Sequence, residues 1–168
     1  MKNFYLLILS FVVFFNNYSF AEMKLEVSKN EFEGTTNNFL MSDFINPNTP
    51  LSFPYDKSQS ALILQCKGSI PYVYFDEVNL VGGETGDGYD TYTIKLKAKE
   101  KFYEVMATQD FGSNKVAFNF LPTDKDTVTT LMKENDEVWI QFNHYQDGKR
   151  FYKYDTRGTL DLFSKHCY

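Results

Sequence analysis

Two cysteines and two histidines have the most distinctive chemistry in this sequence: Cys66, Cys167, His144 and His166. A zinc site usually takes three or four Cys, His or carboxylate ligands, and a redox-active pair is usually found as Cys-x-x-Cys. The two cysteines lie about 100 residues apart, so neither pattern is present. With only two cysteines there is one possible intrachain pairing. We therefore predict a structural Cys66–Cys167 disulfide and no metal.

Motifs for catalysis are absent from the sequence. It contains no Gly-x-Ser-x-Gly and no His-Glu-x-x-His, the motifs of common hydrolases. We predict that the protein is not an enzyme and needs no cofactor. The acids and glycines from Glu84 to Asp90 could hold calcium weakly, but the distal glutamate of an EF-hand loop is missing. A solvated hairpin loop is the favoured interpretation.

A stripe of lysines is the first candidate binding surface. Lys95, Lys97, Lys99 and Lys101 alternate with other residues and would share one face of a strand. Such a stripe could meet an anionic partner or lipid headgroups. The favoured alternative is that the lysines protect an edge strand from pairing with other chains.

A predicted hairpin supplies the second candidate surface. Asp147-Gly148 is a preferred pair for a two-residue type I′ turn between segments 137–145 and 149–155. That turn would place on one face the residues Trp139, Tyr145, Arg150, Tyr152 and Tyr154. The opposite face would hold the better core candidates, Val138, Ile140, Phe142 and Phe151. Since Tyr, Trp and Arg dominate interaction hot spots, the first face is predicted to bind a protein partner. Packing beneath the N-terminal segment is the alternative.

The scaffold for these residues is predicted to be mainly β. Alternating apolar and polar residues predict strands at 24–28, 38–45, 61–66, 71–78, 92–99, 102–108 and 115–121, besides the hairpin. One helix is predicted at 123–134, with Thr123 as its cap and Val128, Leu131 and Met132 on its apolar face. A short helical tail, 160–166, leads to Cys167. We expect an antiparallel β-sandwich with one short helix and a single disulfide.

The first 21 residues have the pattern of a cleaved export signal. Lys2 precedes an apolar run from Phe4 to Phe15, and Ser19 and Ala21 are small residues at −3 and −1 of a cleavage site. The run is too short to span a bilayer. We therefore predict a signal peptide at 1–21 and a single secreted β-domain at 22–168, located in the periplasm or outside the cell. Export would also permit the disulfide.

Charge argues against nucleic acid as a partner. The leader contains one lysine and no acidic residue, so its removal changes the net charge from −5 to −6. Binding to phosphates needs clustered Lys and Arg on a basic protein. No second apolar stretch approaches the length of a membrane span. The expected partner is a protein, either a secretion component or an enzyme.

Several features in a fixed order carry a resemblance to a known family. They are Leu62-Ile63-Leu64-Gln65-Cys66, Val73-Tyr74-Phe75 with Leu80-Val81-Gly82-Gly83, Thr93 to Leu96, Val128 to Asp136, and Val138 to Tyr145 followed by Tyr154-Asp155-x-x-Gly158. With them the chain resembles the TagO-like, or type VI secretion-associated, small exported proteins, which are also found in prophages. The family has arginine at the positions of Gln65 and Gln141, and tyrosine at that of Ile94. The resemblance implies a periplasmic accessory role and supplies no catalytic residue.

Two functions follow as expectations. The first is a non-enzymatic periplasmic or secreted binding protein, accessory to a secretion system or prophage. The alternative is an inhibitor or immunity protein that blocks a wall-degrading or toxic enzyme. Such a blocker usually inserts a loop into a cleft, and the segment from Gly82 to Tyr89 is the candidate loop.

Overall fold

The computed structural model describes residues 22–76, 91–111, 116–144 and 146–167. Its strands are β1 (Lys24–Asn30), β2 (Thr35–Met41), β3 (Ser60–Gln65), β4 (Ile70–Phe75), β5 (Thr91–Ala98), β6 (Lys101–Phe111), β7 (Val116–Phe120), β8 (Glu137–His144) and β9 (Gly148–Asp155). Its helices are α1 (Lys125–Glu134) and α2 (Thr159–His166).

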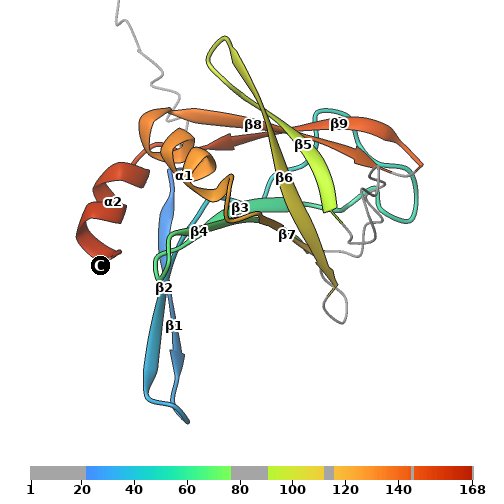
Figure 1. Cartoon of the computed structure of the whole chain (residues 1–168). Helices are drawn as coiled ribbons and strands as arrows, with labels where there is room; N and C mark the ends of the chain where they lie inside the picture. Colours follow the sequence, from blue (N-terminus) through green and yellow to red (C-terminus); the bar gives the residue numbers. More distant parts are fainter. Residues whose placement is uncertain (1–21, 77–90, 112–115, 145, 168) are drawn as a thin grey trace, which may run out of the picture.

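The described strands form one antiparallel sheet in the order β1-β2-β3-β4-β7-β6-β5-β8-β9 (Figure 1). The chain passes from β4 to β5, which lies three places along the sheet, and then returns through β6 and β7 to pair with β4. This crossover puts β5 inside the sheet, between β6 and β8.

The sheet folds over so that β3 and β9 come into contact. The Ser60 hydroxyl in β3 lies 2.7 Å from the Tyr154 hydroxyl in β9. In the segment between β2 and β3, the Asn48 backbone N–H donates to the Phe151 carbonyl at 2.8 Å, and the Asn48 side chain accepts from the Phe151 N–H at 2.8 Å. The segment around Asn48 therefore covers part of the outer edge of β9.

Aromatic rings fill the space inside the folded sheet. Phe75 makes edge-to-face contacts with Phe118, Phe142 and Tyr152, at centroid distances of 5.8, 5.2 and 5.5 Å. This geometry aligns the positive ring edge with the negative ring face. The prediction that Ile140 and Phe142 belong to the core is confirmed, since both are buried.

Helix α1 begins two residues later than predicted. Asp124, not Thr123, is its N-cap. The Asp124 carboxylate accepts from the Met106 backbone N–H at 3.0 Å instead of capping its own helix. The predicted apolar face of Val128, Leu131 and Met132 is buried. Figure 1 shows α1 and α2 side by side at one end of the sheet, where they contact each other.

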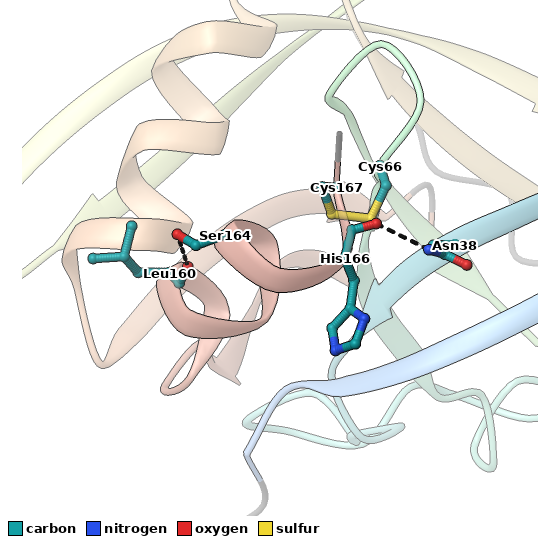
Figure 2. Close-up of a disulfide and its surroundings, with 6 residues drawn as sticks. All are labelled: Asn38, Cys66, Leu160, Ser164, His166 and Cys167. Carbon is teal, nitrogen blue, oxygen red and sulfur yellow. Dashed lines mark hydrogen bonds between the residues drawn. A yellow bond between two sulfur atoms is a disulfide. The ribbon is translucent and has the colours of Figure 1, made fainter.

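The disulfide joins Cys66, just after β3, to Cys167, just after α2, as predicted. Figure 2 shows the Asn38 side chain beside it, donating to the His166 carbonyl at 2.9 Å. Leu162 and Phe163 of α2 pack against the core. The bond therefore fixes α2 onto the sheet at the same place as these contacts. A mainly β, antiparallel fold with a single disulfide is confirmed.

Candidate functional site, an aromatic groove

The β8–β9 hairpin differs from the predicted one in its register. Gly148 pairs with His144 and Tyr152 pairs with Ile140, whereas a two-residue turn would have paired Tyr152 with Asn143. Gly148 has a left-handed backbone, with φ +67°, which glycine adopts without strain. The difference is three positions, and an odd shift exchanges the faces on which the side chains of β9 lie.

Contacts from a distant segment hold this turn. The backbone N–H and the hydroxyl of Ser52 donate to the Asp147 carboxylate at 3.0 and 2.7 Å. The Arg150 guanidinium donates to the Asp147 carbonyl and lies 3.4 Å from its carboxylate. The Ser52 hydrogen bonds, more than Arg150, hold the pKa of Asp147 below its usual value. Asp147 therefore anchors the turn to the rest of the protein.

In this register the residues predicted to form one partner-binding face do not share an exposed face. Tyr152 and Tyr154 are fully buried. Arg150 is directed to Asp147, and its side chain is only 18% exposed. Tyr145 lies outside the described residues. Trp139 is on the opposite face from the buried tyrosines, since it pairs with Lys153 in the alternating register.

The exchange of faces creates a different surface on the outside of the sheet. Phe151, which was predicted to be in the core, is 39% exposed there. A groove of about 720 Å³ crosses this outer face over β5, β6, β8 and β9. It is lined by Lys95, Leu96, Lys97, Phe102, Tyr103, Glu104, Trp139, Gln141 and Phe151.

Strand pairing arranges most of these side chains, together with Lys153, in two rows. The first row runs Phe102, Lys97, Trp139, Lys153 across β6, β5, β8 and β9. The second row runs Glu104, Lys95, Gln141, Phe151 across the same strands. Directly opposed residues lie on the same face of a sheet and interact with each other. We call these two rows the aromatic–lysine groove.

Cation–π contacts order the first row. The Lys97 ammonium lies 5.6 Å from the Phe102 ring centroid and 5.8 Å from that of Trp139, and the Lys153 ammonium lies 5.4 Å from the Trp139 ring. Such contacts are favourable within about 6 Å. The Trp139 ring is therefore flanked by two lysines, and its position is set before any partner arrives.

Charge is unevenly paired within the groove. Lys153 and the Trp139 indole N–H both bind Glu137, at 2.6 and 3.0 Å, and these hydrogen bonds lower the pKa of Glu137. Lys95 pairs with Glu104 at 2.9 Å. Among the described residues, Lys97 makes no ion pair with a carboxylate. The centre of the groove thus holds a cation that no carboxylate in the described part of the chain neutralises.

Exposed apolar side chains continue the groove along β6. Phe102 is 74% exposed and Met106, on the same face, is 43% exposed. Single exposed apolar residues are common, but a contiguous patch with a polar rim marks an interaction site. Together with Phe151 and Trp139, these residues add apolar area to a face that also carries Lys95, Lys97 and Glu104.

The lysine stripe does not lie on an edge strand, so the favoured interpretation of it is wrong. β5 is an interior strand, so its lysines do not protect an edge. Lys95 and Lys97 face the groove. Lys99 occupies the β5–β6 turn with φ +52°, and Lys101 begins β6. β5 ends at Ala98, although the alternation of lysines in the sequence continues to Lys101. The four lysines therefore do not share one face of a single strand.

The remaining sequence candidates lie elsewhere. His144 is buried beside Tyr152, whereas His166 ends α2. In the described part of the chain, no three His, Cys, Asp or Glu side chains gather as metal ligands would. The candidate inhibitory loop from Gly82 to Tyr89, and with it the acidic segment from Glu84 to Asp90, falls outside the described residues.

His144 is a buried titratable group whose pKa the fold shifts strongly. Burial lowers its pKa to about 4; the nearby Asp147 acts in the opposite direction, and Arg150 adds to the lowering. Its Nε2 lies 3.1 Å from the Tyr152 hydroxyl, inside the aromatic core. The folded protein therefore keeps this imidazole neutral at pH values where the unfolded chain protonates it.

Acid is expected to destabilise the fold through His144. The imidazole has a pKa of about 6.5 in the unfolded chain and about 4 in the folded protein. Between these pH values, the unfolded chain binds a proton and the folded protein does not. The free energy of unfolding should therefore fall by up to about 3 kcal/mol between pH 6.5 and 4. Urea unfolding at several pH values measures this, and His144→Gln should flatten the slope. An equal slope in both proteins would contradict the prediction.

The sequence alone did not place Phe102, Phe151 and Lys153 in a binding surface, nor the polar groove residues Glu104 and Gln141. Phe102 follows the lysine stripe directly, and the short turn at Lys99 and Glu100 places it opposite Lys97. That signal was available, because two-residue turns fix the register of the strands they join. Phe151 and Lys153 could not be placed without the correct register of β9.

Comparisons with known proteins give no family assignment: no family model matches the chain, and neither a curated protein nor a solved structure is significantly similar to it. Among the described residues, no helix has the length and apolar character needed to span a membrane.

Proposed function

We propose that this is an exported, non-enzymatic binding protein whose aromatic–lysine groove holds an apolar, carboxylate-bearing segment of a partner protein. One observation carries the proposal: two ordered rows, rich in aromatic and lysine side chains and at least partly exposed, cross four strands. An apolar segment would cover Phe102 and Phe151, and a carboxylate would pair with Lys97.

The chemistry of the groove favours this class of partner. Aromatic residues anchor protein interfaces because they bury a large area with little loss of side-chain freedom. Lys97 is already oriented by two rings and has no carboxylate of its own among the described residues. A partner carboxylate would therefore gain an ion pair without displacing an existing one, which favours specificity and fast association.

The proposed setting is the periplasm or the cell exterior. The disulfide is consistent with an oxidising compartment, and the apolar leader supports export. The resemblance to TagO-like proteins supports an accessory role beside a secretion system or prophage. That context stays a prediction from the sequence.

Binding through the groove can be tested with matched variants. Phe102→Ala removes an exposed ring of the groove, and Phe53→Ala removes an 86% exposed ring outside it. Lys97→Glu reverses the central charge, and Lys67→Glu makes the same change at an exposed turn. We expect a periplasmic partner to bind wild type and both controls, and each groove change to weaken binding by about 2 kcal/mol, roughly thirtyfold.

The measurement is a calorimetric titration with the captured partner, and thermal melting checks that each variant is folded. Equal affinity of the wild type and both folded groove variants would contradict the proposal. The segment from Gly82 to Tyr89 would then be the next surface to change.

A further inference from the structure

The β1–β2 hairpin extends beyond the body of the sheet as an arm. Only the last three residues of β2, Phe39 to Met41, pair with β3. The half of the hairpin from Ser28 to Asn37 forms strand pairs only with itself, and Figure 1 shows it pointing away from the other strands. An isolated two-stranded ribbon is only marginally stable in water. A partner that covers one of its faces would stabilise it.

The tip of this arm presents a single aromatic side chain. Phe32 is 99% exposed and stands between two exposed carboxylates, Glu31 and Glu33. The Asn30 side chain accepts from the backbone N–H groups of Phe32 and Glu33 at 3.1 and 3.2 Å. Gly34 closes the turn with φ +65°. The tip is therefore a defined turn that carries an apolar side chain with negative charge on both sides.

The tip and the aromatic–lysine groove are complementary in apolar character and in charge. The groove offers exposed rings for Phe32 and the cation Lys97 for a glutamate. Lys95 and Lys153 are each paired with a carboxylate, Glu104 and Glu137, so Lys97 is the cation that the tip would meet. In Figure 1 the arm points away from β5, β6, β8 and β9, so a tip cannot enter the groove of its own molecule. Only a second copy can bring the two together.

We propose that the hairpin tip of one molecule docks into the aromatic–lysine groove of the next. This inference rests on the proposed function of the groove and names one occupant for it. Because two different surfaces meet, the contact is heterologous and generates a ring or an open chain of molecules. One hairpin turn covers less area than a standard interface, so a weak dissociation constant, roughly micromolar to millimolar, is expected.

Sedimentation of the full mature chain over a range of concentrations tests this. The average mass of the wild type should rise with concentration, and the association should weaken as salt screens the glutamate–lysine attraction. Phe32→Ala and Lys97→Glu should each weaken association by about tenfold or more. The controls Phe53→Ala and Lys67→Glu should associate as the wild type does.

A charge exchange makes the test specific. The double variant Glu31→Lys, Glu33→Lys has a basic tip and a basic groove, whereas Lys97→Glu has an acidic tip and a more acidic groove. Alone, each should associate at least about tenfold more weakly than the wild type. Their mixture should associate, because each tip then meets a groove of opposite charge.

Two results would overturn the inference. One is a wild type that stays monomeric up to millimolar concentration. The other is an association constant that neither Phe32→Ala nor Lys97→Glu changes. That result would point to pairing along the exposed β1 edge at Val27. Neither result would contradict the proposed function. Binding of a foreign partner is measured separately, with Phe102→Ala.

Discussion

Replacing Phe142 with alanine is expected to lower the free energy of unfolding by about 3–5 kcal/mol. Phe142 is 2% exposed and contacts the rings of Phe75, Phe118 and Tyr152. Its removal leaves a cavity at the centre of the aromatic core, where the surrounding rings are fixed by the sheet and cannot collapse into the space. Urea unfolding followed by circular dichroism measures the loss.

Phe151→Ala is the matched control, because it deletes the same ring from the neighbouring strand. In the observed register Phe151 is half-exposed in the groove, and its loss should cost less than about 1 kcal/mol. In the register expected from a two-residue turn, both phenylalanines would lie in the core. Equal losses for the two variants would therefore contradict the hairpin described above.

Removal of the disulfide is expected to cost about 2–5 kcal/mol. The bond closes a loop of 101 residues, which in the chain-entropy model restricts the unfolded state strongly. The double variant Cys66→Ser, Cys167→Ser avoids a free thiol and is the protein to measure by urea unfolding. Amide exchange should show the greatest loss of protection in α2, which the bond ties to the sheet.

A reducing agent provides the control for this experiment. It should destabilise the wild type by the same amount and leave the double variant unchanged. A double variant as stable as the wild type, within about 0.5 kcal/mol, would show that the packing of Leu162 and Phe163 holds α2 without the bond.

Local patterns predicted the elements of this fold better than their arrangement. Alternation in segments such as 92–99 depends on one strand and its two faces, so it is visible in the sequence. The place of β5 depends on the crossover that pairs β4 with β7, and no local pattern records it. The lysines of β5 were therefore assigned to an edge that they do not occupy.

In the groove, too, single residues were predicted better than their arrangement. Lys97 and Trp139 were both singled out from the sequence, but in separate surfaces, and only the pairing of β5 with β8 brings them together. Ser52 binds Asp147 across 95 residues of chain and so contacts the turn that precedes β9. A dipeptide such as Asp147-Gly148 favours a turn type, but such distant contacts decide between turns of similar energy.

Trp139 is the single tryptophan of the chain, and it lies in the groove between Lys97 and Lys153. Light that excites tryptophan selectively therefore reports from this one place. The emission of an indole responds to its solvent and to nearby charges, and a segment that enters the groove changes both. The protein thus carries its own optical probe, and occupancy of the groove can be followed without a label.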